Sequence, residues 1–242
     1  MKKIVVGFMM LAVVGASAQV KKTIAPVKKP AVQAKPATAT VKSKERLIEI
    51  TTDYGVMVAK LYDSTPLHRD NFVKLVQEKF YDSLLFHRVI SNFMLQGGDP
   101  VSKTADSAAM LGSGSLPGER IPAEFKTGII HKKGALAAAR DGNPQKASSN
   151  CQFYIVQGKK TDTAQLRQIE QGVKANNPSF TYTKTQREIY QRIGGTPFLD
   201  QNYTVFGEVI SGLDVIDKIA AVQTRPGDRP VKDVRMKIRL LN

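Results

Sequence analysis

Residues 86–100, which read FHRVISNFMLQGGDP, bring together side chains that can bind and polarise a ligand. Arg88 offers five N–H donors in a rigid fork and stays protonated, so it cannot act as a base. Phe93 and Met94 add apolar surface, and Gln96 adds an amide. Because no second carboxylate, no cysteine and no evident nucleophile accompanies them, these residues alone leave open which reaction the stretch could serve.

Nearby residues that could suggest other chemistry have simpler interpretations. His87 could act as an acid or a base, but strand alternation places it on the opposite face from Arg88, which predicts a structural role. Gly97-Gly98 lacks the G-x-x-x-x-G-K pattern of a phosphate-binding loop and predicts a tight turn. The histidines are too scattered to indicate a metal site: His68, His87 and His131. We therefore expect no metal and no cofactor.

The first half of the chain predicts a hairpin, a helix and short strands. Residues 46–62 alternate apolar and polar side chains on both sides of a central Asp-Tyr-Gly turn, which predicts a β-hairpin. Thr65-Pro66 supplies an N-cap and a first-turn proline for a helix over residues 66–79. Apolar pieces between 84 and 96 predict strands, whereas residues 100–123 are rich in glycine, serine and proline and predict loops.

The second half predicts more strands, one further helix and an insertion. Strands are expected at residues 134–139, 152–158, 204–210 and 234–240, and a helix at 213–221. Phe153 points away from Gln152 and Tyr154 in such a strand, so we assign it to the core. Residues 161–195 are polar with helical spacing and are interpreted as an insertion. Many short strands with two helices indicate a mainly β fold, either an antiparallel sandwich or a barrel.

The first 44 residues are predicted to precede the folded domain, which we place at 45–242. Residues 1–18 carry two lysines before an apolar run and end in Ala16-Ser17-Ala18, which predicts a secretory signal peptide. The run is too short to favour the alternative, a transmembrane anchor. Residues 19–44 hold seven lysines, three prolines and no acidic residue, which predicts a basic disordered linker.

Export to the periplasm, or secretion from the cell, follows from a signal peptide. Cys151 is the only cysteine, so it cannot form an intramolecular disulfide and is predicted to be a buried structural thiol.

The linker could contact anionic envelope surfaces weakly or serve as a solvated spacer. Residues 45–242 contain 27 basic and 21 acidic residues, a net charge of +6 against +15 for the whole chain. We expect a monomer with no nucleic-acid partner.

Four motifs resemble those of the cyclophilin-type peptidyl-prolyl cis-trans isomerases. They are FHRVISNFMLQGGDP, LAAAR, NCQFYI and PFLDQNYTVFGEVISGLDVIDKI, in the order and approximate spacing of that family. The similarity runs from about Arg46 to Leu241 and is interrupted by the insertion. The resemblance implies a closed eight-stranded antiparallel β-barrel capped by two α-helices, with the substrate groove on the outside of the barrel.

Position by position, the resemblance implies a proline-binding groove. Arg88 matches the catalytic arginine, and Gln96 and Gln152 match amides that hold the substrate backbone. Ala139 and Arg140 match the strand segment along which the peptide lies. The positions that match the pocket walls and rim are Phe93, Met94, Tyr154, Phe198, Leu199 and Tyr203.

Four of these positions depart from the commonest eukaryotic pattern. Phe198 stands where tryptophan is frequent, and without an indole N–H we expect weaker binding of cyclosporin, the family's inhibitor. Tyr203 stands where histidine is frequent and keeps a ring with a polar tip. Arg140 replaces a frequent asparagine, and Tyr154 adds a hydroxyl where phenylalanine is common.

The implied reaction suits the residues of the opening stretch, because rotation about an X–Pro bond makes and breaks no covalent bond. We therefore expect an isomerase that assists the folding of exported proteins and binds their proline-containing segments. One alternative is a proline-binding module or chaperone with little turnover, and another is an envelope adaptor that acts through residues 19–44. The insertion enters just before Phe198, so we expect it to lie beside the groove and filter substrates.

Overall fold

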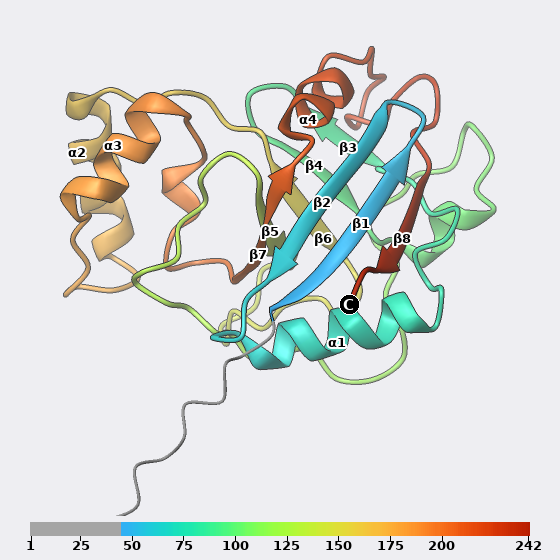
Figure 1. The fold of residues 1–242 in the computed structure, drawn as a ribbon, viewed down its shortest axis with the longest axis horizontal. Coiled ribbons are helices and arrows are strands. Elements are labelled where there is room, and N and C mark those ends of the chain that lie inside the picture. The colour runs from blue at the N-terminus through green and yellow to red at the C-terminus, as the bar shows by residue number, and fades with distance from the viewer. Residues whose placement is uncertain (1–44) are drawn as a thin grey trace, which may run out of the picture. The chain divides into compact units, whose positions relative to one another are not determined.

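The computed structural model describes residues 45–242 and shows a strongly curled β-sheet with helices at its ends and on one side (Figure 1). The strands are β1 (Arg46–Thr52), β2 (Gly55–Leu61), β3 (Arg88–Ile90), β4 (Met94–Gly97), β5 (Ala135–Ala138), β6 (Phe153–Val156), β7 (Val205–Ser211) and β8 (Met236–Leu240). The α-helices are α1 (Pro66–Gln77), α2 (Thr163–Lys174), α3 (Lys184–Arg192) and α4 (Leu213–Ala220), and the short 3-10 helices are η1 (Pro100–Lys103) and η2 (Pro197–Leu199). The predicted signal peptide 1–18 and linker 19–44 lie outside the described residues. None of the helices within 45–242 has the length and apolar character needed to cross a membrane.

All eight strands form one antiparallel sheet in the order β3-β4-β6-β5-β7-β2-β1-β8. The segment before β3 joins the two edge strands, because it pairs with the start of β8 and with the residues before β8. The N–H of Ser83 donates to the carbonyl of Met236, and the N–H of Phe86 donates to the carbonyl of Val234, both at 2.9 Å. The predicted eight-stranded antiparallel, barrel-like fold is therefore confirmed, with α1 and α4 as the helices at its two ends (Figure 1).

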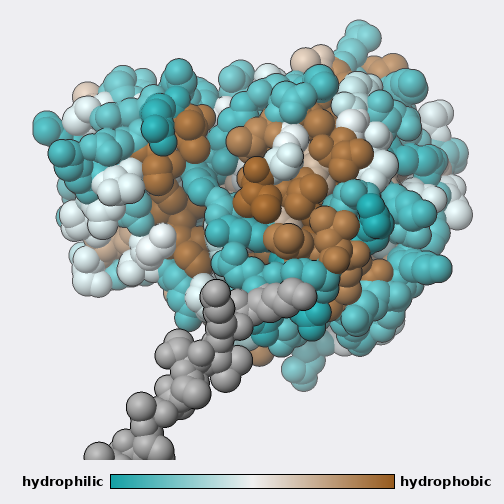
Figure 2. All heavy atoms as spheres, viewed as in Figure 1, coloured by the Kyte–Doolittle hydropathy of each residue, from teal (hydrophilic) through white to brown (hydrophobic). Residues whose placement is uncertain are grey.

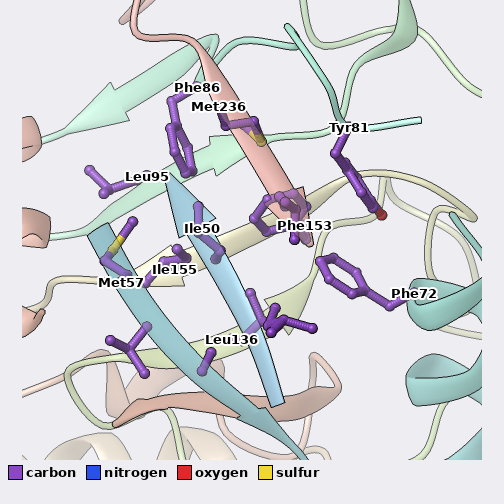
Figure 3. Packing of buried hydrophobic residues seen from close by; sticks show 14 of the residues in the cluster. Ile50, Met57, Phe72, Tyr81, Phe86, Leu95, Leu136, Phe153, Ile155 and Met236 are labelled. Carbon is purple, nitrogen blue, oxygen red and sulfur yellow. The ribbon is translucent and has the colours of Figure 1, made fainter. Parts of the chain in front are cut away.

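The barrel interior is filled by the inward-pointing, alternate side chains of the strands, part of which Figure 3 shows. Phe72 of α1 stacks on Tyr81 with ring centroids 4.8 Å apart and meets the edge of Phe153 at 5.4 Å. Phe153 is 1% exposed, so its predicted place in the core is confirmed. Cys151 is a buried free thiol, also as predicted, and burial raises its pKa.

Local predictions need correction at the end of the first helix, in the loop region and at the glycine pair. The first helix ends at Gln77 rather than at residue 79. The predicted loop region 100–123 contains the short helix η1. Gly97 is the last residue of β4 rather than part of a turn, while Gly98 adopts a φ of 93°, a conformation that favours glycine.

Helix α1 begins at Pro66 as predicted, but a residue distant in the sequence caps it. Thr65, the expected cap, makes no capping hydrogen bond with its side chain. The Glu124 carboxylate instead accepts from the backbone N–H groups of Leu67 at 3.2 Å and His68 at 3.0 Å. Burial lowers the pKa of His68, and its Nδ1 lies 2.7 Å from the same carboxylate. Glu124 therefore joins the start of α1 to the segment before β5.

The insertion forms α2 and α3 around a small apolar core of its own. Its buried members are Leu166, Val173, Phe180, Tyr182 and Tyr190, together with Ile130 from the segment before β5. The two ends of the insertion meet at Lys159 and Gly195, whose backbones exchange hydrogen bonds of 3.3 and 3.1 Å. On the face shown in Figure 2, apolar side chains gather in a strip where the insertion faces the barrel. Helix α2 packs against η2, which carries Phe198.

The capping role of Glu124 predicts a loss of stability in Glu124→Gln. An amide of the same shape removes the charge and points an NH₂ group at donors, so we expect the free energy of unfolding to fall by about 2 kcal/mol. Urea unfolding at pH 7 measures this change. Glu119→Gln, at an exposed position, is the matched control and should change stability by less than about 0.5 kcal/mol. Equal stability of the two variants would contradict the capping role.

Candidate active site

The site lies on the outer face of the sheet, where β3, β4 and β6 run side by side. Register pairs Arg88 with Gln96 and Gln96 with Tyr154, so these three side chains form a row across the strands. Their sequence neighbours point the other way, into the barrel core. Strand pairing alone therefore places an arginine, an amide and an aromatic ring on one surface.

A hollow of about 100 Å³ opens beside this row. It is lined by Arg88, Phe93, Met94, Gln96, Ala139, Arg140, Tyr154, Leu199 and Tyr203. Nine of the eleven residues expected at the site thus surround one space. The other two, Gln152 and Phe198, lie beside it and contact its lining residues.

The Arg88 side chain is held from two sides. Its Nε donates to Asp228 Oδ2 at 3.2 Å, and its Nη1 lies 3.5 Å from Gln96 Oε1. Both Arg88 and Asp228 are partly exposed, with 42% and 43% of their side-chain surface accessible, so the ion pair orients more than it stabilises. The backbone carbonyl of Asp228 also accepts from the N–H of Val89 at 2.8 Å. No local pattern marked Asp228, which follows Arg88 by 140 residues.

The two glutamines form a chain of hydrogen bonds that leads away from Arg88. Gln96 Nε2 donates to Gln152 Oε1 at 3.0 Å. Gln152 Nε2 donates in turn to the carbonyls of Gly112 and Gly114 at 2.9 and 2.7 Å. The amide donors of Gln152 are thus already engaged by the protein, so its clearest contribution is to hold Gln96 and the loop around residues 112–114. That loop was not predicted as part of the site.

This loop borders a second, larger hollow of about 540 Å³, which shares Gln96, Ala139 and Arg140 with the first. The carboxylate of Asp99 holds the loop by accepting from the N–H groups of Gly112 at 2.5 Å and Gly114 at 3.3 Å. The hollow continues the site along the surface.

The apolar wall of the first hollow is extended by a pair of phenyl rings. Phe93 and Phe198 stack with centroids 5.7 Å apart at an angle of 30°. Phe198 is 53% exposed, so it forms a rim rather than part of the floor. Met94 is 2% exposed and Leu199 is half-buried, and both lie deeper in the hollow.

Arg140 also lines the hollow and packs on Tyr203. The guanidinium carbon is 4.4 Å from the ring centroid, a cation–π contact, and Nη2 donates to Asn202 Oδ1 at 3.0 Å. The backbone groups of Ala139 are already paired, with the carbonyl of Gln152 and the N–H of Ser149. Within residues 45–242, the backbone N–H and C=O of Arg140 have no hydrogen-bond partner.

The histidines take structural positions. His87 is 2% exposed and lies on the face opposite Arg88, as predicted. Burial lowers the pKa of His87 to about 4. His68 and His131 contact carboxylates in other parts of the fold. Among the residues that the structure describes, no three histidine, cysteine or acidic side chains gather as metal ligands.

Comparison with known proteins identifies the family. The model described as "Cyclophilin type peptidyl-prolyl cis-trans isomerase/CLD" matches residues 47–239. A protein of Staphylococcus aureus (strain USA300) with the name "Putative peptidyl-prolyl cis-trans isomerase" is 34% identical over 195 residues, which cover 80% of this chain and 90% of that protein. A Staphylococcus saprophyticus protein of the same name is 35% identical over 184 residues, covering 76% and 85% of the two chains.

Solved structures agree on the fold. A crystal structure of a Cryptosporidium parvum cyclophilin type peptidyl-prolyl cis-trans isomerase aligns with a TM-score of 0.60 at 20% identity, covering 82% of this chain and 99% of that one. A second crystal structure of that protein, in the presence of the dipeptide Ala-Pro, aligns with a TM-score of 0.58. The chain therefore belongs to the cyclophilin-type peptidyl-prolyl cis-trans isomerases, and its enzymatic activity is that of this family.

The buried His87 predicts that stability falls in mild acid. Its pKa is about 4 in the folded protein and near 6.5 when unfolded, so only the unfolded chain gains a proton between these values. The free energy of unfolding is therefore highest above pH 6.5. It falls by about 3 kcal/mol as the pH falls to about 4. Urea unfolding of wild type and His87→Gln between pH 4 and 7 measures it. The variant should show a flatter pH dependence, and identical slopes would contradict the assignment.

Proposed function

We propose that this isomerase rotates X–Pro bonds at the hollow beside Arg88 and acts on proline-containing segments of exported proteins. The observation that carries the assignment of the site is the free end of the Arg88 guanidinium. Nε and Nη1 contact Asp228 and Gln96, whereas Nη2 has no hydrogen-bond partner within residues 45–242. Nη2 is thus a fixed, permanently charged donor beside an apolar hollow.

Such a donor matches what the reaction needs. The barrier to rotation, about 18–20 kcal/mol, arises from amide resonance. In the twisted transition state the prolyl nitrogen becomes pyramidal and regains a lone pair that can accept a hydrogen bond. A donation from Arg88 to that nitrogen stabilises the twisted form more than either planar isomer, and this difference lowers the barrier.

The surrounding residues support a bound proline and its flanking chain. Phe93, Met94 and Leu199 offer apolar contact to a pyrrolidine ring and exclude water, which strengthens the hydrogen bond from Arg88. Gln96 can donate to the carbonyl that precedes proline while the other side rotates. The unpaired backbone N–H and C=O of Arg140 can pair with an extended peptide, as an added strand does at a sheet edge. Binding of Ala-Pro by this chain is the corresponding proposal, in line with the Cryptosporidium parvum structure.

Exported proteins are the proposed clients because the first 18 residues have the pattern of a signal peptide. Isomerisation at this site requires neither ATP nor a redox partner, which suits a compartment outside the cytoplasm. The linker 19–44 would then separate the domain from the cleavage site, and its lysines could add weak contact with anionic envelope surfaces.

The role of Arg88 predicts a large loss of turnover in Arg88→Ala. We expect kcat/KM for a short X-Pro peptide, measured by NMR exchange, to fall by about 10² because one transition-state donor is lost. Arg239→Ala is the matched control, since Arg239 pairs with Glu49 on the barrel surface and should leave the rate unchanged. A folded Arg88→Ala protein with near-normal turnover would refute the assignment. Wild type that binds the peptide without accelerating exchange would favour the alternative, a binding module or chaperone.

The proposed export predicts a new N-terminus. When the full chain is produced in a bacterial host and the cells are fractionated, we expect the protein outside the cytoplasm, beginning at Gln19 after cleavage behind Ala18. N-terminal sequencing of the isolated protein measures this. Replacing Ala16 and Ala18 with arginine should block cleavage, because the site requires small residues. An uncleaved wild-type chain confined to the cytoplasm would contradict the proposal.

A further inference from the structure

A buried carboxylate behind the proposed pocket accepts four hydrogen bonds. Asp200 is 1% exposed and directly follows Leu199, which lines the pocket. Its Oδ1 accepts from the backbone N–H of His131 at 2.8 Å and lies 2.7 Å from Nδ1 of the same residue. Its Oδ2 accepts from the hydroxyls of Tyr182 at 2.7 Å and Tyr190 at 2.5 Å. No lysine or arginine within residues 45–242 forms an ion pair with it, so these donors stabilise the charge.

The contact with Asp200 fixes the orientation of the His131 ring. With Nδ1–H donating to the carboxylate, Nε2 is left to bond with a different partner. Nε2 lies 3.0 Å from the hydroxyl of Tyr154, and the two rings are nearly parallel, at 12°. The Tyr154 hydroxyl is therefore hydrogen-bonded to His131. Because Tyr154 lines the hollow beside Arg88, the hydrogen-bonded chain leads from Asp200 to the wall of the proposed pocket.

Two of the four donors to Asp200 belong to the insertion. Tyr190 lies on α3 and Tyr182 lies just before it. Burial, together with the charge of Asp200, raises the pKa of both phenols, so both remain protonated donors at neutral pH. The insertion is also fixed at its base, since the N–H of Thr196 donates to the carbonyl of His131 at 2.8 Å. The insertion is thus joined to the pocket through specific polar contacts as well as apolar packing.

We infer that Tyr182 and Tyr190 are positioning residues for the isomerase site: they hold Asp200, which orients His131, which holds the Tyr154 wall of the pocket. This inference rests on the proposed site beside Arg88. It gives the insertion a role in catalytic geometry that is distinct from the selection of substrates. A phenylalanine at position 154 would need no such chain, because it has no hydroxyl to be held.

The test compares the full-length protein with Tyr182→Phe/Tyr190→Phe, which removes two hydroxyls and keeps both rings. We expect kcat/KM for a short X-Pro peptide to fall about tenfold, because misplacement of a pocket wall weakens transition-state binding. In a Tyr154→Phe background, the same double change should lower kcat/KM little further, because the hydroxyl that contacts His131 is already absent. The 15N chemical shift of His131 Nε2 should also move in the double variant as its contact with Tyr154 changes.

The control is Val173→Ala, which loosens the apolar core of the insertion and leaves the hydroxyls in place. It should lower the melting temperature while kcat/KM and the His131 shift stay as in wild type. An equal loss of turnover in Val173→Ala, or unchanged turnover in the double tyrosine variant, would overturn the inference. If the double variant does not fold, the two single variants are compared in the same way.

Two further readouts separate this inference from the proposed site. If wild type fails to accelerate exchange, the proposed function fails. Peptide affinity from NMR titration and the His131 shift then still decide whether the insertion acts on Tyr154. Suppose instead that wild type is active and Arg88→Ala is not, which supports the site. If Tyr182→Phe/Tyr190→Phe then lowers kcat/KM by the same factor in wild type and in Tyr154→Phe, the positioning role is wrong.

Discussion

Strand alternation across β3, β4 and β6 is the constraint on which both the core and the site depend. Val89, Leu95 and Ile155 turn into the barrel and are at most 2% exposed. Their neighbours Arg88, Gln96 and Tyr154 must therefore turn outward, where register places them in a row. A slip of one residue would bury the guanidinium and expose the core, so the free energy that stabilises the barrel also fixes the position of the proposed catalytic arginine.

A reaction without bond making or breaking places its demands on geometry. In the proposed mechanism, the donor must meet the prolyl nitrogen only as that nitrogen becomes pyramidal, which requires a side chain with little freedom. Asp228 and Gln96 restrain Arg88 from two sides, and Gln152 restrains Gln96 in turn. The polar contacts on this surface thus hold one donor in place beside an apolar hollow, and each of them comes from a different segment of the chain.

The insertion also takes part in restraining the site, through hydrogen bonds behind the pocket. A buried carboxylate is costly unless donors surround it, and Asp200 has four. Because Tyr182 and Tyr190 supply two of these, the insertion is part of the polar network through α3 and the segment before it. A fully satisfied network of this kind favours a single arrangement of the residues that compose it.

The sequence by itself determined the local features of this protein. Period-two alternation assigned Phe153 to the core and His87 to the face opposite Arg88, and the four motifs identified the family and the residues around the hollow. Only the tertiary structure decided that Glu124 caps α1, that Asp228 orients Arg88 and that the insertion reaches Tyr154 through Asp200. These partners are distant in sequence and leave no periodic pattern, because their contacts depend on how the sheet curls and closes. Local alternation can say which way a side chain points, but only the closed fold determines what it meets there.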